Sequence, residues 1–140
     1  MIITQPKEEI GDFVAKRTSV HYLPSNYTAI AKKDEKGVVV GWIYNGFITD
    51  NSRKIVDCQI HVAARENTKW ATKDFLFHAF SYPFDQIGCN RITALIKEKN
   101  KMALKTCIRL GFKKEGLLRE AQDGENLVVL GMLKKECKWI

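Results

Sequence analysis

The chain has 140 residues, of which 45% are hydrophobic and 28% are charged, and its formal net charge at pH 7 is +7. This length and this balance are typical of one soluble globular domain and exclude a disordered or fibrous protein. No apolar run approaches the ~20 residues that a membrane-spanning helix needs, and the N-terminal segment is too polar for a secretion signal. We therefore expect a cytoplasmic protein, without membrane contact, that forms a single domain over residues 1–140.

The four cysteines are scattered along the chain and form no Cys-x-x-Cys pair. Closely spaced pairs are the usual signature of a structural zinc site, and small secreted domains carry regular disulfide frameworks. The spacing here predicts reduced thiols and no bound metal.

The first third of the chain predicts a helix followed by an antiparallel hairpin. Residues 7–17 place apolar side chains at helical spacing, with acidic residues first and basic residues last, as the helix dipole favours. Residues 27–33 and 38–44 favour strands and are separated by a polar segment that ends in glycine. Asn45-Gly46 is a strong turn dipeptide, so we expect a further turn there.

Residues 54–62 predict a central strand with one polar face. Its apolar side chains alternate with Asp57, Gln59 and His61, and alternate residues of a strand point to the same side of the sheet. These three polar side chains should therefore lie together.

The second half alternates helices and strands. The apolar stripe of residues 71–84 predicts a buried helix that Pro83 ends or kinks. Residues 91–97 predict a strand, residues 100–110 a helix, and residues 126–133 a last strand. Such an order predicts a mixed sheet with helices on both faces, in which ligands collect beyond the carboxyl ends of strands.

The clearest signal is the segment NKMALKTCIRLGFKKEG, residues 100–116. It resembles the C-terminal motif of the GNAT superfamily, the acyl-CoA-dependent N-acetyltransferases, in which Asn begins a helix, a small residue follows and Gly-Phe ends the helix. Asn100, Ala103, Gly111 and Phe112 fit that spacing.

The resemblance covers about residues 55–133, and residues 115–133 are similar to the branch that acetylates the N-termini of ribosomal proteins. It implies an α/β (α+β) fold with a mixed, mostly antiparallel sheet of six or seven strands, flanked by helices on both faces. It also implies transfer of an acetyl group from acetyl-CoA, as co-substrate, to a primary amine by direct attack in a ternary complex. The protein could act as a monomer or a homodimer.

Physical chemistry alone gives these positions structural roles. Asn100 stands where a helix N-cap is needed, Gly111 suits the left-handed backbone that ends a helix, and Phe112 can bring the next strand into the core. The resemblance gives Asn100 a second role, contact with the pantetheine arm of CoA.

The segment RENTKWATKD, residues 65–74, occupies the place of the family's pyrophosphate loop, whose pattern is Arg/Gln-x-x-Gly-x-Gly/Ala. Counting back from the buried helix puts Thr68 and Trp70 at the glycine positions, and Lys69 stands where related proteins also have a lysine. The start of the following helix is an anion site even without glycine, because its free N–H groups and its dipole need no particular side chain. Two outcomes stay open: the loop binds acetyl-CoA in a shifted pose, or Trp70 fills the pocket. The cofactor contacts that the resemblance implies are Ile60, Val62, Asn67, Thr68, Lys69, Trp70, Ala71, Thr72 and Asn100.

Amide formation needs a base for the ammonium, polarisation of the thioester carbonyl and an acid for the departing thiolate. His61 is a candidate base and Asp57 can attract the cationic amine. A backbone N–H between Ile60 and Val62 would polarise the carbonyl. Cys107 stands where many relatives have the Tyr that acts as the acid.

Two alternatives to catalysis follow from the same residues. The missing glycines and the missing Tyr also suit a degenerate GNAT-like protein that binds a partner without catalysis. Residues 91–114 carry eight Lys or Arg and a single acid, Glu98, which suits binding or modification of nucleic acid, or an acidic partner.

Overall fold

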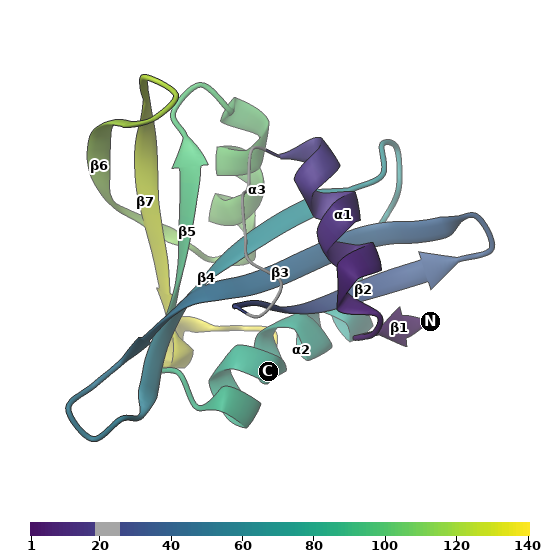
Figure 1. Ribbon diagram of the computed structural model, residues 1–140, viewed down its shortest axis with the longest axis horizontal. Helices are drawn as coiled ribbons and strands as arrows, with labels where there is room; N and C mark the ends of the chain where they lie inside the picture. The colour runs from purple at the N-terminus through teal and green to yellow at the C-terminus, as the bar shows by residue number, and fades with distance from the viewer. Residues whose placement is uncertain (19–25) are drawn as a thin grey trace.

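Seven strands form one mixed sheet in the order β1-β2-β3-β4-β5-β7-β6 (Figure 1). The structure is a computed structural model that describes residues 1–18 and 26–140. Neighbouring strands are antiparallel except β4 and β5, which are parallel. The predicted mixed, mostly antiparallel sheet is therefore confirmed. The strands are β1 (Ile2–Ile3), β2 (Thr28–Asp34), β3 (Gly37–Thr49), β4 (Ile55–Ala64), β5 (Arg91–Lys97), β6 (Lys113–Gln122) and β7 (Glu125–Leu133).

Helices cover both faces of this sheet. Side chains of α2 and α3 share one buried cluster with β3, β4, β5 and β7, and α1 packs with β2, β3 and β4 into a second cluster on the opposite face. None of the helices in the described ranges combines the length and the apolar character needed to cross a membrane. The helical elements are α1 (Lys7–Arg17), α2 (Lys73–Ser81), the π-helical turn η1 (Tyr82–Ile87), α3 (Lys101–Leu110) and the 3-10 turn η2 (Lys134–Glu136).

The face that α1 covers is only half occupied. Figure 1 shows α1 lying across β2, β3 and β4, and no helix of the described residues lies over the same face of β5, β7 and β6. We call the α1-side surface of β5, β7 and β6, together with the adjoining side chains of β4, the open face. It presents polar side chains to solvent in the middle of the sheet.

Glycine determines how closely α1 approaches the sheet. A Cβ atom on Gly41 of β3 would lie 3.0 Å from Cγ2 of Val14 and 3.2 Å from Cγ2 of Ile10. Both helix residues are fully buried. The predicted bounds of this helix, 7–17, are those of the structure.

The turn predicted at Asn45-Gly46 is wrong. Strand β3 continues to Thr49, and Gly46 adopts a φ of +58° inside it, where the register with β4 shifts. A left-handed glycine thus forms a β-bulge there instead of a turn. The chain reverses at Asp50, whose Oδ1 accepts the N–H groups of Ser52 at 2.8 Å and Lys54 at 3.1 Å.

The buried helix departs from its predicted bounds, 71–84. Thr72 caps it, α2 ends at Ser81, and the chain continues through Pro83 as the π-helical turn η1, which Gly88 ends with a φ of +91°. Proline is tolerated because the carbonyl of Ala79, four residues earlier, accepts the Tyr44 hydroxyl at 2.6 Å in place of the N–H that proline lacks.

Strand β6 was not predicted from the sequence. Nearly all of its residues are exposed, and its sequence, KKEGLLREAQ, has no apolar alternation. It lies at the edge of the sheet and pairs only with β7, so its polar character is that of an edge strand.

Candidate active site

Strands β4 and β5 separate in the middle of the sheet. The N–H of Asn90 donates to the carbonyl of Val56 at 3.0 Å, and Gln59 faces Thr93. Beyond that point no further residue pair joins the two strands within the described part of the chain, and Figure 1 shows them running apart. The facing edges therefore carry backbone N–H and C=O groups without a strand partner, as an extended ligand requires.

The polar side chains of β4 share the open face, as predicted. His61 faces Ile43 in the register with β3, and Ile43 packs under α1, so the alternation puts Asp57 and Gln59 on that same side. Gln59 crosses over Gly46, where a Cβ atom would lie 3.1 Å from its amide.

Asp57 is tied to two residues of β5. Its carboxylate accepts a hydrogen bond from the Thr93 hydroxyl at 3.0 Å, and the Arg91 Nε lies 3.5 Å from its Oδ2. Burial raises the pKa of the Asp57 carboxyl, and the Thr93 hydroxyl and the Arg91 charge offset part of that rise. Arg91 makes its shorter contact, 2.7 Å, with Glu115 of β6. Sequence reasoning missed Thr93, Arg91 and Glu115, because only the strand order brings them beside Asp57.

His61 is half-buried and neutral at physiological pH. Burial lowers its pKa to about 4. Its Nε2 lies 2.9 Å from Oδ1 of Asn45, so Nε2 carries the proton and Nδ1 is left as the acceptor. A histidine with such a low pKa is a weak general base at neutral pH.

The loop between β4 and α2 is held by its own hydrogen bonds. The Thr68 hydroxyl donates to the Arg65 carbonyl at 2.7 Å, the Thr72 N–H donates to the Trp70 carbonyl at 2.8 Å, and Thr72 Oγ1 accepts the Phe75 N–H. The only positive φ among residues 65–72 is that of Asn67, at 56°.

The first turn of α2 retains free donors. The N–H groups of Lys73 and Asp74 have no acceptor among the described residues, and the side chains of Lys69 and Lys73 are exposed. Ala71 beside them is also exposed. Free N–H groups and exposed lysines at a helix start are what the anion site predicted from the sequence requires.

Trp70 packs on the core. Its ring lies edge-on to that of Phe75, with centroids 6.4 Å apart, and it borders the buried cluster between the sheet and α2. The indole is half-buried. The helix start is therefore flanked by Trp70 on its apolar side and by Lys69 and Ala71 on its solvent side.

Asn100 and Cys107 lie on α3. Asn100 is its N-cap, as predicted, because Oδ1 accepts the Ala103 N–H at 3.2 Å. Cys107 points into the buried cluster, and burial raises the pKa of its thiol to about 11. Gly111 ends α3 with a φ of +114°, and Phe112 is buried, which confirms the structural roles predicted for both.

The basic segment is partly neutralised by acids from other elements. Arg91 pairs with Glu115, Lys97 with Asp123 and Glu125, and Lys113 with Glu136. The remaining cations of the segment have no carboxylate within 4.0 Å among the described residues; they are Lys99, Lys101, Lys105, Arg109 and Lys114.

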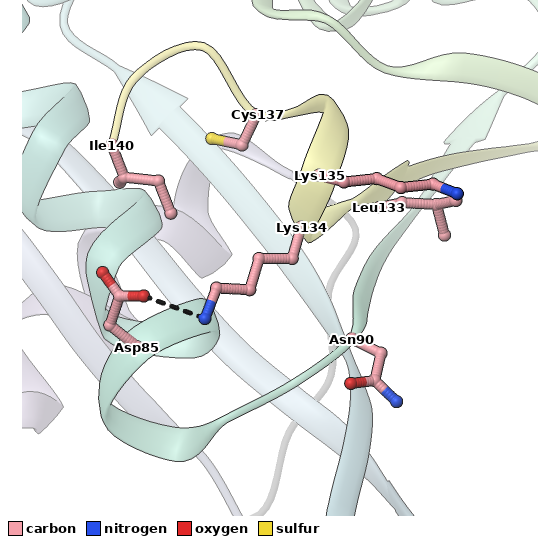
Figure 2. Close-up of a pocket in the computed structure, with 7 residues that line it drawn as sticks. All are labelled: Asp85, Asn90, Leu133, Lys134, Lys135, Cys137 and Ile140. Carbon is pink, nitrogen blue, oxygen red and sulfur yellow. Dashed lines mark ion pairs between the residues drawn. The ribbon is translucent and has the colours of Figure 1, made fainter.

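A hollow of about 680 Å³ lies at the opposite end of the sheet (Figure 2). Lys134 pairs there with Asp85 at 3.2 Å, and Cys137 and Ile140 form its apolar wall. Because Asn90 lines it just before β5 begins, it is remote from the carboxyl ends of β4 and β5 and does not coincide with the predicted site. Among the described residues, no three His, Cys, Asp or Glu side chains converge on a possible metal position.

Solved structures resemble this arrangement. A variant of spermidine N-acetyltransferase SpeG from Vibrio cholerae matches with a TM-score of 0.76 at 10% identity, over 100% of this chain and 95% of that one. The fold is that of the GNAT acetyltransferases. Ribosomal-protein-S5-alanine acetyltransferase from Vibrio fischeri has a TM-score of 0.66 at 14% identity, over 81% and 65% of the two chains. RimJ from Mycobacterium smegmatis, in complex with CoA-disulfide, has a TM-score of 0.65 at 16% identity, over 79% and 55%.

This chain spans less than two thirds of the length of the last two proteins. No family model and no curated protein matches its sequence. The likeness at these identities establishes the GNAT-like α/β fold.

Proposed function

We propose that the protein is an N-acetyltransferase that moves the acetyl group of acetyl-CoA to a primary amine by direct attack in a ternary complex. The observation that carries this proposal is the separation of β4 and β5 after Gln59 and Thr93. It leaves strand edges for the pantetheine arm in a chain with the GNAT fold, with an anion site at the carboxyl end of β4. RimJ, a structural neighbour, was solved with a CoA derivative.

The cofactor's diphosphate would bind at the start of α2. The free N–H groups of Lys73 and Asp74 and the exposed Lys69 supply the donors. Asn67 has the left-handed backbone that a glycine position of this loop supplies, and asparagine tolerates that geometry. The loop therefore aligns with the family pattern one residue earlier than counting from the helix indicated. In that register Asn67 and Lys69 take the glycine positions, and Trp70 needs no glycine-like geometry.

Asp57 is the proposed acceptor of the amine's proton. It lies on the open face where the strands separate, and its pKa is raised, which suits a general base. His61 is left with a supporting role, because its Nδ1 can accept a hydrogen bond although its pKa of about 4 makes it a weak base.

The chemical step balances with these groups. The ammonium gives one proton to Asp57, the neutral amine attacks the thioester carbon, and an N–H between Ile60 and Val62 donates to the carbonyl oxygen. The C–S bond then breaks, the nitrogen loses its second proton to solvent, and the CoA thiolate takes a proton. We propose solvent as the donor of that proton, because burial raises the pKa of the Cys107 thiol to about 11 and makes it a weaker acid than the CoA thiol.

Calorimetry with CoA and acetyl-CoA tests the cofactor site. Lys69→Ala should weaken binding by about 3- to 10-fold, as loss of one exposed charge at a phosphate implies. Lys36→Ala, which removes an exposed lysine from the β2–β3 turn, is the matched control and should change nothing. Absence of binding at millimolar CoA would refute the proposal and favour a non-catalytic GNAT-like protein.

A basic surface favours a second candidate function, nucleic-acid binding. Lys101, Lys105 and Arg109 repeat at helical spacing along α3, and no carboxylate of the described residues neutralises them. Affinity for DNA or RNA that falls steeply with salt would support this function, and a flat salt dependence would exclude it.

A further inference from the structure

Charged side chains alternate in sign across the open face. Asp57 of β4, Arg91 of β5 and Glu115 of β6 lie in a row, with 3.5 Å between Arg91 Nε and Asp57 Oδ2 and 2.7 Å between Arg91 Nη2 and Glu115 Oε1. Their side chains are 15%, 30% and 37% exposed, respectively, so a ligand can reach all three.

Gly131 of β7 makes room for this row. A Cβ atom there would collide with Arg91 Nη2, at 2.5 Å, and with Glu115 Oε1. Thr93 faces Gly131 across the sheet and holds Arg91 through its hydroxyl, 3.1 Å from Nη2. The guanidinium therefore lies flat on the sheet in a defined position.

The two partners of Arg91 are not equivalent. Glu115 contacts Nη1 as well as Nη2, at 3.4 Å and 2.7 Å, whereas Asp57 has only the long contact to Nε. Both oxygens of Asp57 share one neutral side-chain donor, the Thr93 hydroxyl. Asp57 can thus accept an ammonium group without breaking the Arg91–Glu115 pair.

Arg91 also keeps donor capacity. A guanidinium has five N–H groups, two of them on Nη1, and within residues 1–18 and 26–140 Nη1 makes a single contact, with Glu115. A carboxylate can therefore bind Arg91 while Glu115 remains in place. A ligand that carries both an ammonium and a carboxylate complements a carboxylate that can accept and a guanidinium with a spare N–H.

We propose that the acceptor is a free α-amino acid, whose ammonium binds Asp57 and whose carboxylate binds Arg91. This inference rests on the proposed acetyl transfer. A polyamine has no carboxylate and leaves the spare N–H of Arg91 without an acceptor. A peptide N-terminus or a simple amine lacks the neighbouring carboxylate and engages Asp57 alone.

Thiol release from acetyl-CoA, measured with free amino acids, their α-amides and spermidine, tests the inference. We expect KM to be about 10- to 100-fold lower for the preferred amino acid than for its amide, as one charge-assisted contact implies. Arg91→Met should abolish that ratio by raising KM for the acid, and Arg91→Lys should restore part of it. Lys97→Met, which removes another cation of β5, is the control and should keep the ratio.

Calorimetric titration of the amino acid and its amide without CoA separates this inference from the proposed function. Binding of the acid that depends on Arg91, in a protein that does not bind CoA, would retain the zwitterion site and refute acetyl transfer. If the protein binds CoA but binds the amino acid and its amide with equal affinity, the amino-acid site is overturned and acetyl transfer is not. Turnover of spermidine at the same rate as the amino acid would also overturn the amino-acid site. Thermal unfolding of each variant shows whether a loss is one of folding.

Discussion

The close packing of α1 on Gly41 of β3 predicts that a larger residue at this position destabilises the protein. In Gly41→Ala the new methyl group would lie 3.0 Å from Val14 Cγ2 and 3.2 Å from Ile10 Cγ2, which is closer than ordinary carbon contact. Overpacking of this kind costs about 1–3 kcal/mol, and alanine recovers about 0.5–1 kcal/mol of the backbone entropy that glycine loses in a strand. We expect a net destabilisation of about 0.5–2 kcal/mol.

A double-mutant cycle isolates the contact. Val14→Ala alone should cost about 2 kcal/mol, because it removes buried methyl groups and leaves a cavity. The same change removes the atom closest to the new methyl, so Gly41→Ala in a Val14→Ala background should cost about 1 kcal/mol less than in the parent protein.

Urea unfolding of the four proteins is the assay. A loss of 1 kcal/mol should also lower Tm by about 3–4 °C in a chain of this size. Gly116→Ala is the matched control, because a Cβ atom on Gly116 meets nothing within 4 Å and its stability should not fall. The reasoning fails if Gly41→Ala is as well tolerated as Gly116→Ala, or if the cycle is additive within about 0.3 kcal/mol.

Further predictions concern the site. Burial lowers the His61 pKa to about 4, from an unperturbed value near 6.5. Between these two pH values the unfolded chain is protonated at His61 and the native protein is not. The free energy of unfolding should therefore fall by up to about 3 kcal/mol as pH drops from 6.5 to 4. His61→Gln should remove that dependence, and an unchanged slope in denaturant titrations would contradict it. Thr72→Ala should cost about 1 kcal/mol through loss of the α2 N-cap, whereas Thr106→Ala, which only loses a bond to the Met102 carbonyl within α3, should be nearly neutral in thermal unfolding. Asp57→Asn should lower kcat for thiol release by at least about 100-fold and leave calorimetric CoA affinity unchanged, and a loss below 10-fold would exclude Asp57 as the base.

Elements with strong local signals were predictable. The bounds of α1 follow from apolar spacing and from the order of its charges, and α3 follows from Asn100 as N-cap and Gly111 as left-handed C-cap. Each signal depends on residues within about one helical turn, whose geometry is the same wherever the helix lies. The same holds for the shared face of Asp57, Gln59 and His61, which strand alternation requires.

Elements whose structure depends on a neighbouring strand were not predictable from the sequence. A glycine such as Gly46 can form a turn or a β-bulge. Here β3 pairs with β4 on both sides of Gly46, so the glycine forms a bulge. Strand β6 has no apolar face to reveal it, and it forms because β7 offers a row of backbone partners. The left-handed residue of the loop after β4 is Asn67, which counting from the helix did not indicate.

The helices α1 and α3, the central polar strand and the resemblance to acetyltransferases could be recognised in the sequence, because these depend on the order of neighbouring residues. The separation of β4 and β5 after Gln59 and Thr93, and the position of Arg91 and Glu115 beside Asp57, are visible only in the folded sheet. Those residues come from three strands that are far apart in the chain. Their proximity results from strand order and register, which the packing of the whole sheet selects and no local segment encodes.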